Sequence, residues 1–285
     1  MSSPRRPDKR LGQHFLTDAN ILGRIVDALD PAPGDVVLEI GAGTGSLTRV
    51  LAPRVGTVIA IEKDRQLAAE CGVRNAECGI DNATIVQGDA LKVSWHALLD
   101  AHTDTPHSAL RIPPFKVVGN IPYNITSPLL EKALTPPLAE RIVFLVQAEV
   151  AERVAAAPGS KGGAYGALSI GVQALCRVER LFTVRAGAFR PPPKVDSAVL
   201  RLTPLGRPLV APEEVAAFRA FVAACFSRRR KQLRNVIMAA TGRPAAAVLA
   251  GLEALGLDAA ARPETLAPVV FARLWRWNAT FILSA

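Results

Sequence analysis

Residues 36–45 read VVLEIGAGTG, and this stretch decides the fold. Its first half is a short run of aliphatic and β-branched residues, which predicts a buried β-strand at 36–40. Its second half places glycine at alternate positions ahead of a helical pattern. Gly41 and Gly43 suit a tight turn and a close approach of the backbone to a ligand, while Gly45 suits close packing of the helix. The stretch therefore predicts a strand, a ligand-binding turn and a helix.

Further apolar runs follow the first one, and helix-like segments separate them. These runs occupy residues 57–61, 84–86, 115–118 and 142–146. Short β-branched runs with helical connections indicate a Rossmann-like α/β fold, with a mostly parallel, doubly wound sheet. Strands expected near 179–186 and 195–202 extend this sheet and, because a short connection joins them, we expect them to be antiparallel. Residues 101–114 read as a loop.

A segment containing Pro and Gly at 203–208 marks a change in the character of the chain. Residues 212–285 are rich in Ala, Leu and Arg with helical spacing and carry no strand pattern. We therefore expect two domains, a cofactor-binding α/β domain at 1–203 and a small all-helical domain at 204–285.

The net charge of the chain is +9, and most of it lies in two short segments. Residues 1–10 contribute +3 and residues 228–234 contribute +5. Concentrated positive charge is typical of a protein that binds a polyanion such as a nucleic acid. A solvated surface or tail is the alternative, which fits the second segment less well because that segment continues a helical pattern. The basic residues expected to contact nucleic acid are Lys9, Arg10, Arg228, Arg229, Arg230, Lys231 and Arg234.

Composition excludes several classes of protein. Hydrophobic residues make up 49% and charged residues 21% of the chain, which is a globular mixture. No stretch reaches the roughly 18 uncharged apolar residues of a membrane span, and residues 1–10 have no apolar core for a secretion signal. We therefore expect a cytosolic protein, and nothing in the sequence suggests more than a monomer. The four cysteines lack paired spacing, so we expect no metal and no disulfide.

Acidic residues follow the second and third predicted strands. Glu62 comes 21 residues after Gly41, where a carboxylate can accept hydrogen bonds from a ribose diol. Asp89, followed by Ala90, stands where a carboxylate can accept a hydrogen bond from an adenine amine. A helix cap is the alternative for one such acid, but three successive strand ends with polar or glycine features favour a ligand site. Glu39 can either contact the cofactor or hold the loop.

The spacing of the glycines bears on the identity of the cofactor. G-x-G-x-G differs from the G-x-G-x-x-G of NAD and FAD sites, in which a helix N-terminus packs against a pyrophosphate. S-adenosylmethionine has no phosphate to place there, yet its ribose and adenine still need the acids. We therefore expect S-adenosylmethionine, with a dinucleotide as the competing interpretation.

Residues 120–123, Asn-Ile-Pro-Tyr, end the fourth predicted strand and suit methylation of an exocyclic amine. The amine of adenine is a poor nucleophile because its lone pair is delocalised into the ring. The side-chain oxygen of Asn120 and a nearby backbone carbonyl can accept hydrogen bonds from the N–H groups of this amine, and so stabilise the transition state. Pro122 stiffens the turn, and Tyr123 can stack on the base. A plain turn after a strand is the alternative.

Phe189 is a second aromatic candidate for the base pocket. It precedes Arg190 and three prolines, and a rigid Pro-rich loop could present its ring as the other wall of the pocket. A base would have to leave its stack to enter such a pocket. Packing of Phe189 in the core is the alternative.

Taken in order, these motifs resemble one known family over nearly the whole chain, the KsgA family of small-subunit ribosomal RNA adenine dimethyltransferases. The matching pieces are residues 11–16 (LGQHFL), 39–45 (EIGAGTG), Glu62, Asp89, 120–123 (NIPY), 189–199 (FRPPPKVDSAV), 226–235 (FSRRRKQLRN) and 262–264 (RPE). The resemblance implies dimethylation of two adjacent adenosines in a hairpin near the 3′ end of 16S rRNA, in an assembling 30S subunit. It also implies that the helical domain recognises rRNA.

The resemblance also assigns cofactor-binding positions. It implies that the segment with His14 and Leu16 closes over the cofactor. It further implies that Gly41, Glu62, Asp89 and Asn120 match other binding positions of the family. His14 stands where some members carry Asn, and both side chains can form hydrogen bonds.

Other functions compete with this interpretation. The related Erm group methylates large-subunit rRNA, but residues 228–235 and 262–264 favour the small-subunit family. A DNA adenine methyltransferase would need a sequence-reading domain, which nothing here resembles. A factor that acts mainly by binding assembling subunits is a further alternative, against which the intact Asn120 motif and the acids argue.

Overall fold

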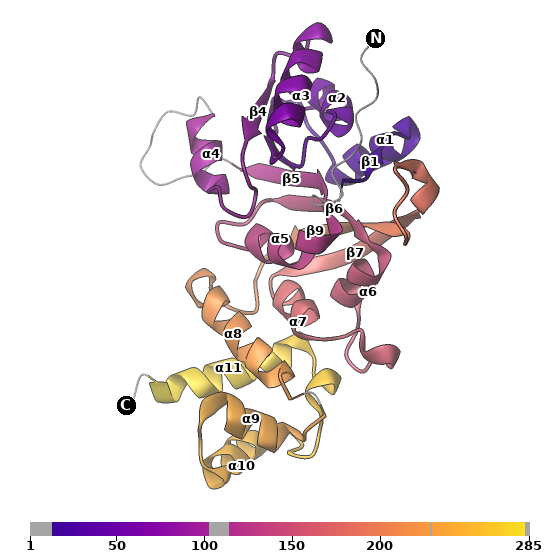
Figure 1. Ribbon diagram of the computed structural model, residues 1–285. Coiled ribbons are helices and arrows are strands. Elements are labelled where there is room, and N and C mark those ends of the chain that lie inside the picture. The colour runs from indigo at the N-terminus through magenta and orange to yellow at the C-terminus, as the bar shows by residue number, and fades with distance from the viewer. Residues whose placement is uncertain (1–12, 103–113, 229, 283–285) are drawn as a thin grey trace. The chain divides into compact units, whose positions relative to one another are not determined.

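The computed structural model describes residues 13–102, 114–228 and 230–282, and the chain divides into two compact units (Figure 1). Unit 1 comprises Met1–Ala151 with Glu179–Pro204, and unit 2 comprises Glu152–Val178 with Leu205–Ala285. The sequence predicts a single boundary between residues 203 and 204. The structure has a boundary one residue later and, in addition, groups 152–178 with the C-terminal helices.

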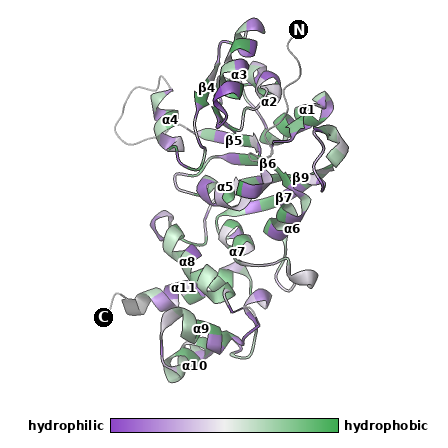
Figure 2. Cartoon of the chain, viewed as in Figure 1, coloured by the Kyte–Doolittle hydropathy of each residue, from purple (hydrophilic) through white to green (hydrophobic). Residues whose placement is uncertain are grey.

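A seven-stranded sheet organises unit 1, with the strand order β4-β3-β2-β5-β6-β9-β7. Its strands are β2 (Val36–Ile40), β3 (Thr57–Glu62), β4 (Ala83–Gln87), β5 (Phe115–Asn120), β6 (Arg141–Gln147), β7 (Cys176–Val184) and β9 (Ser197–Pro204). From β4 through β6 each neighbouring pair is parallel, whereas β9 runs antiparallel to β6. The predicted strands and the mostly parallel α/β sheet are confirmed. β5 and β6 are buried along nearly their full length, and β6 is predominantly hydrophobic (Figure 2).

Helices connect the parallel strands, and polar caps fix where several of them begin. The helical segments of this part of the chain are α1 (Ala19–Leu29), α2 (Ser46–Leu51), η2 (Ala52–Arg54), α3 (Arg65–Glu77), α4 (Trp95–Ala101), η3 (Tyr123–Ile125), α5 (Thr126–Ala133), α6 (Ala148–Ala155) and η5 (Ala186–Ala188). Asp18, Asp64 and Ser94 each accept backbone N–H groups from the first turn of α1, α3 and α4. These caps start the helices immediately after the loops that leave the sheet.

A two-stranded antiparallel sheet, which the sequence analysis did not predict, ties the N-terminal segment to the loop before β9. Its strands are β1 (Phe15–Leu16) and β8 (Phe189–Arg190). Leu16 pairs with Phe189, and both side chains belong to the hydrophobic core that also contains residues of α1, α2 and the sheet. This pairing holds residues 13–16 close to the glycine-rich turn.

Unit 2 is helical, as expected of residues beyond 204. Its segments are η4 (Lys161–Gly163), α7 (Ala167–Gln173), η6 (Pro212–Glu214), α8 (Val215–Phe226), α9 (Leu233–Thr241), α10 (Ala245–Ala254), η7 (Pro263–Thr265) and α11 (Pro268–Ile282). Tyr165, just before α7, is fully buried and donates to the carbonyl of Leu266 over 2.8 Å. Such contacts explain why residues 152–178 group with the C-terminal helices.

The basic segment at 228–234 is not a continuous helix, contrary to our expectation, because only its last two residues, Leu233 and Arg234, are helical among those described. α8 ends at Phe226 and α9 begins at Leu233, and the described residues between them form a turn. The N–H groups of Leu233 and Arg234, which a continuous helix would bond internally, donate instead to the carbonyls of Ala261 and Ala259. The local sequence pattern continues across this turn, so the helix break follows from contacts distant in sequence.

In the described part of the chain, no single helix is long and apolar enough to cross a bilayer. α9 and α10 meet the length and composition criteria only as a pair, and they are bent by 118° at their junction.

Candidate active site

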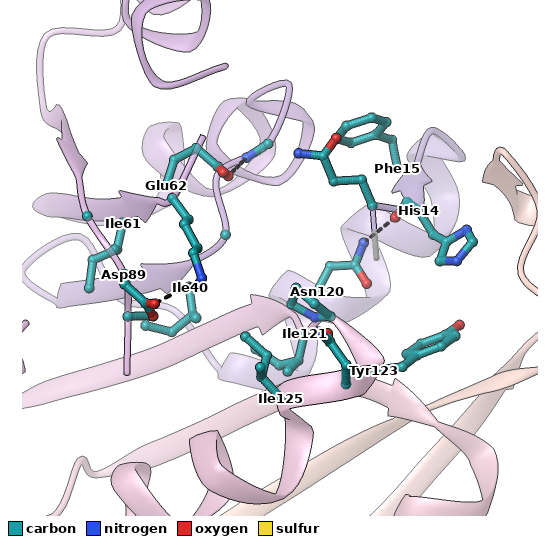
Figure 3. A pocket seen from close by; sticks show the side chains of 18 residues that line it. His14, Phe15, Ile40, Ile61, Glu62, Asp89, Asn120, Ile121, Tyr123 and Ile125 are labelled. Carbon is teal, nitrogen blue, oxygen red and sulfur yellow. Dashed lines mark hydrogen bonds and ion pairs between the residues drawn. The ribbon is translucent and has the colours of Figure 1, made fainter. Parts of the chain in front are cut away.

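A cleft opens at the carboxyl ends of β2, β3, β4 and β5 (Figure 3). In the sheet, β3 and β4 lie on one side of β2, and β5 and β6 lie on the other. The direction of the strand order therefore reverses between β2 and β5, which is the topological switch point of the sheet. Ligands of open α/β sheets bind at such a point. The cleft has a volume of about 910 Å³, including space open to solvent. The predicted residues that line it are His14, Gly41, Gly43, Glu62, Asp89, Ala90, Asn120, Pro122 and Tyr123.

Glu62 ties the glycine-rich turn to the end of β3. It is 7% exposed; its Oε2 accepts the N–H of Gly43 over 2.8 Å, and its Oε1 accepts the N–H of Asp64 over 2.8 Å. Gly43 has a φ of +55°, and a Cβ there would lie 3.3 Å from the ring of Phe15. The turn is therefore fixed by the protein itself, and each carboxylate oxygen keeps a further acceptor position for a ligand.

Gly45 closes the turn against α3, as the sequence analysis expected. Its φ is +75°, and a Cβ there would lie 2.8 Å from Sγ of the buried Cys71. A side chain at this position would be strained and would also push the start of α2 away from α3.

Asp89 is held beyond the end of β4 by two partners. Its Oδ1 accepts the N–H of Leu91 over 3.0 Å, and its Oδ2 lies 2.9 Å from Nζ of Lys63. The hydrogen bond from Lys63 is the main reason why the pKa of Asp89 lies below its usual range. The carboxylate is therefore a charged acceptor at neutral pH, which suits recognition of an adenine amine.

Glu39 holds the loop and does not line the cleft. It is fully buried, and its Oε2 accepts the hydroxyl of Thr48 on α2 over 2.7 Å. Within the described residues its Oε1 has no hydrogen-bond partner. Burial, opposed by the Thr48 bond, raises the pKa of Glu39 to about 8, so this carboxyl keeps its proton at neutral pH. Of its two expected roles, the structure favours support of the loop.

Asn120 ends β5 with its side chain oriented by a single hydrogen bond. Its Nδ2 donates to the carbonyl of His14 over 2.9 Å (Figure 3). Within the described residues, Oδ1 has no such bond. Because the amide nitrogen is held by His14, the oxygen is left as the acceptor that can face a ligand in the cleft.

Tyr123 stands beside Asn120 in the same turn and is held at both ends. Its hydroxyl shares a 2.6 Å hydrogen bond with Oγ of the buried Ser197, and the ring of His14 stacks on it with a centroid distance of 5.6 Å. Burial is the main reason that the pKa of Tyr123 lies above its usual range, so the hydroxyl stays neutral. His14 is fixed in turn, because its Nδ1 donates to the carbonyl of Pro191 over 2.8 Å.

Two expected residues do not line this cleft. Phe189 is fully buried in the core of unit 1, which is the alternative that the sequence left open for it. Leu16, its partner in the two-stranded sheet, lines a smaller pocket behind the glycine-rich turn together with Gly43 and Asn120. Phe189 therefore acts on the site in this structure by holding the segment that carries His14.

Several residues of the site were not predicted from the sequence. Lys63 and Ser197 are the partners of Asp89 and Tyr123, and Phe15 covers the turn at Gly43. Phe15 lies inside the LGQHFL motif and Ser197 inside the motif that begins at Phe189, so the motifs offered a signal for both. Lys63 had no signal beyond its place next to Glu62.

The expected nucleic-acid contacts lie in unit 2 and in the N-terminal segment. Arg228, Arg230, Lys231 and Arg234 are exposed. Lys9, Arg10 and Arg229 lie outside the described residues. All four cysteines are free thiols, and among the residues described no group of three or more His, Cys, Asp and Glu side chains could hold a metal ion.

The arrangement of the cleft fits S-adenosylmethionine. The turn at Gly41 and Gly43 leaves room for close backbone approach, and carboxylates stand at the ends of two neighbouring strands for a ribose and an adenine. Asn120 presents an amide oxygen at the end of β5, on the other side of β2. A Rossmann-like sheet with this site defines a methyltransferase of the S-adenosylmethionine-dependent class.

Comparison with known proteins narrows this class. The family described as Ribosomal RNA adenine dimethylase matches residues 5–255, and the chain belongs to that family. A protein of Moorella thermoacetica, Ribosomal RNA small subunit methyltransferase A, is 43% identical over 272 residues, which cover 95% of this chain and 92% of the relative. A protein of the same name from Syntrophotalea carbinolica is 42% identical over 270 residues, covering 94% and 96%.

Solved structures give the same family. A dimethyladenosine transferase from Plasmodium falciparum superposes with a TM-score of 0.76 at 29% identity, covering 94% of this chain and 98% of that one. The 23S rRNA methyltransferase ErmE superposes with a TM-score of 0.67 at 28% identity, covering 93% and 99%. The chain is therefore a methyltransferase of the rRNA adenine dimethylase family, whose fold and family support S-adenosylmethionine as the methyl donor.

Proposed function

We propose that this protein transfers methyl groups from S-adenosylmethionine to the N6 amines of two adjacent adenosines in a hairpin near the 3′ end of 16S rRNA, in the assembling 30S subunit. The observation that carries the proposal is the orientation of Asn120. Its amide nitrogen is engaged by His14, so its oxygen is the group available to an amine in the cleft. We further propose that the protein works as a monomer in the cytosol.

The cofactor would be held by the residues at the strand ends. Glu62 would accept the ribose hydroxyls, Asp89 would accept the adenine amine, and the backbone at Gly41 and Gly43 would approach the ligand closely. The N-terminal segment would close over it, with His14 lining the cleft and Leu16 supporting the glycine-rich turn from the smaller pocket behind it. When bound, S-adenosylmethionine supplies a sulfonium-activated methyl group, so the protein needs only to place the nucleophile.

Asn120 and its neighbours would prepare that nucleophile. In the first transfer, Oδ1 of Asn120 and one backbone carbonyl would accept hydrogen bonds from the two N–H groups of the adenine amine, which localises the nitrogen lone pair toward the methyl group. The N–C bond would form as the S–C bond to the methyl group breaks, and the nitrogen would release one proton to water. In the second transfer a single N–H group is left to be bound in this way. The carbonyl of Pro122 already accepts bonds from Ile125 and Thr126, so we assign this second role to the carbonyl of Ile121. Tyr123 would stack on the base, which is worth roughly 1–3 kcal/mol.

Phe189 enters this proposal only indirectly. The sequence suggested that its ring forms a wall of the base pocket, whereas its burial favours a supporting role through β1 and His14. Replacing Phe189 by Leu would then weaken closure over the cofactor without removing a stacking partner from the base.

The helical unit is proposed to recognise the rRNA. Exposed basic side chains at Arg228, Arg230, Lys231 and Arg234 support this role, and we extend it to Arg229, Lys9 and Arg10. Phosphate contacts of this kind position an RNA without reading its bases. The preference for small-subunit RNA rests on the names of the relatives and on the resemblance of residues 226–235 and 262–264.

Primer extension on rRNA from a strain that lacks this protein tests the proposal. We expect a stop at two adjacent adenosines near the 3′ end of 16S rRNA only when the protein is restored. A stop in 23S rRNA would instead support the Erm-like function, which is the activity named for the related structure ErmE. Restored assembly without any modification would support a factor that acts by binding.

A further inference from the structure

The turn after β4 carries the groups that line the adenine side of the cleft. Asp89 and Ala90 line the cleft, and the turn continues through Val93 to the start of α4 (Figure 1). The N–H groups of Lys92 and Val93 both donate to the carbonyl of Asp89, over 2.8 and 3.0 Å. These bonds close the turn, but they leave its other carbonyls to find partners elsewhere.

Two side chains supply those partners. The indole N–H of the buried Trp95 donates to the carbonyl of Ala90 over 2.8 Å. The ammonium group of Lys132 donates to the carbonyls of Leu91 and Val93, over 2.9 and 2.6 Å. Three carbonyls of the turn are therefore held by side chains, two of them by a single lysine.

Lys132 belongs to the helix that starts at the reaction turn. α5 begins at Thr126, whose hydroxyl lies 3.3 Å from the carbonyls of both Pro122 and Tyr123. Lys132 stands in the last turn of the same helix. One rigid helix therefore contacts the Asn-Ile-Pro-Tyr turn at its first residue and the adenine-side turn near its last.

The surroundings of Lys132 strengthen its hold on the turn. Its ammonium group lies 5.7 Å from the centre of the Trp95 ring, and burial lowers the pKa of Lys132. A partly desolvated ammonium makes strong charge-assisted hydrogen bonds, and its removal would leave two carbonyls without a partner.

We propose that Lys132 is a positioning residue for S-adenosylmethionine, which fixes the turn that carries Asp89 and Ala90 and couples it through α5 to the reaction turn. This inference rests on the proposed function, because it assumes that the adenine of the cofactor binds at Asp89. It assigns no contact between Lys132 and the cofactor. The role is to hold the adenine-side turn in the geometry that binds the cofactor.

Isothermal calorimetry with S-adenosylmethionine on Lys132→Met tests the inference. The change keeps the apolar stem and removes the donor, and we expect the dissociation constant to rise about tenfold, as for the loss of a charge-assisted hydrogen bond. In the transfer assay, KM for S-adenosylmethionine should rise with it and kcat should change little. Lys132→Arg, which keeps donors and charge, should restore most of the affinity.

Lys92→Met is the matched control, because Lys92 is an exposed lysine of the same turn whose charge also acts on Asp89. It should bind S-adenosylmethionine like the wild type. If Lys132→Met lowers the melting temperature but binds with wild-type affinity, the inference is overturned and Lys132 is merely structural. An equal loss of affinity in Lys92→Met would also overturn it, since charge alone would then explain the effect.

The controls separate this inference from the proposed function. If the wild type itself does not bind S-adenosylmethionine, the proposed function fails. If the wild type binds and Lys132→Met binds equally well, only the inference fails. Should Lys132→Met not fold, Lys132→Gln takes its place, with amide hydrogen exchange of residues 89–93 as a second measurement. Faster exchange together with weaker binding supports the inference, and unchanged exchange overturns it.

Discussion

The cleft of unit 1 and the basic turn of unit 2 are organised in opposite ways. In the cleft, Glu62, Asp89 and Asn120 are already held by hydrogen bonds or an ion pair from the protein. In the basic turn, Arg228, Arg230 and Lys231 are exposed and lie between two helices. A preorganised site is sensitive to single substitutions, because each group has one working geometry. An exposed basic surface acts through summed charge, so its losses are gradual.

Asn120→Ala is the substitution with the largest expected effect. It removes the acceptor for the adenine amine, and we expect kcat to fall by roughly 10²–10³-fold, the range found when a single transition-state hydrogen bond is removed. Calorimetric binding of S-adenosylmethionine should stay near the wild-type value. Wild-type turnover in this variant would remove Asn120 from the reaction.

Asn120→Asp divides the two functions of this side chain. It keeps an oxygen acceptor but loses the Nδ2 donor that bonds to the carbonyl of His14. We expect activity between that of the wild type and that of Asn120→Ala. Activity as low as that of Asn120→Ala would mean that orientation by His14 matters as much as the acceptor.

Glu62→Ala should raise the dissociation constant of S-adenosylmethionine by roughly 10–100-fold, because this fold-change corresponds to the free energy of hydrogen bonds to a charged acceptor. The variant also frees the N–H groups of Gly43 and Asp64, so the glycine-rich turn loses its anchor. Calorimetry measures the change, with Glu77→Ala, an exposed acid on α3, as the control. Equal affinities for the wild type and Glu62→Ala would refute the assigned contact.

Replacing Arg228, Arg230 and Lys231 by Gln should weaken RNA binding by an amount that depends on salt. Each lost phosphate contact lowers the slope of log K against log salt by about 1. Filter binding to a 16S rRNA fragment at several salt concentrations measures the slope, with Arg65→Gln, an exposed arginine of unit 1, as the single-charge control. A slope equal to that of the wild type would count against the turn as an RNA contact. A complete loss of binding would mean that the turn is as preorganised as the cleft.

Glu39→Gln should give the smallest effect, a change in how stability depends on pH. In the folded protein Glu39 keeps its proton until the pH reaches its pKa of about 8. In the unfolded chain the same carboxyl loses its proton above about pH 4.5. The contribution of Glu39 to stability is therefore full below about pH 4.5 and declines as pH rises toward 8. Glutamine does not titrate. The melting temperature of the wild type should therefore fall relative to that of the variant as the pH rises across this window. A constant difference would mean that Glu39 is charged in the folded state.

The sheet and the strand-end residues could be predicted from the sequence because both depend on the composition of short, continuous stretches of the chain. Residues 36–45 predict a strand and its turn by composition alone, and Glu62 and Asn120 stand directly at strand ends. Parallel strands bring their carboxyl ends to one edge, so residues far apart in the chain could be expected to meet there.

The remaining features depend on contacts that no local pattern encodes. β1 and β8 are two residues each and pair across a long separation in the chain, so no periodicity marks them. The separation of α8 from α9 follows from hydrogen bonds between the start of α9 and residues 259–261. The burial of Phe189 follows from its pairing with Leu16, whereas the sequence suggested that its ring forms a wall of a base pocket.

Methylation of isolated 30S subunits tests the central claim most directly. Purified protein and S-adenosylmethionine would be incubated with 30S subunits from a strain that lacks the protein, and the nucleosides of the 16S rRNA would be identified by mass spectrometry. We predict N6,N6-dimethyladenosine at two adjacent positions near the 3′ end, and an initial rate of product formation that is roughly 10²–10³-fold lower with Asn120→Ala. Methyl groups on another base or another atom of adenine, or undiminished product with Asn120→Ala, would contradict it.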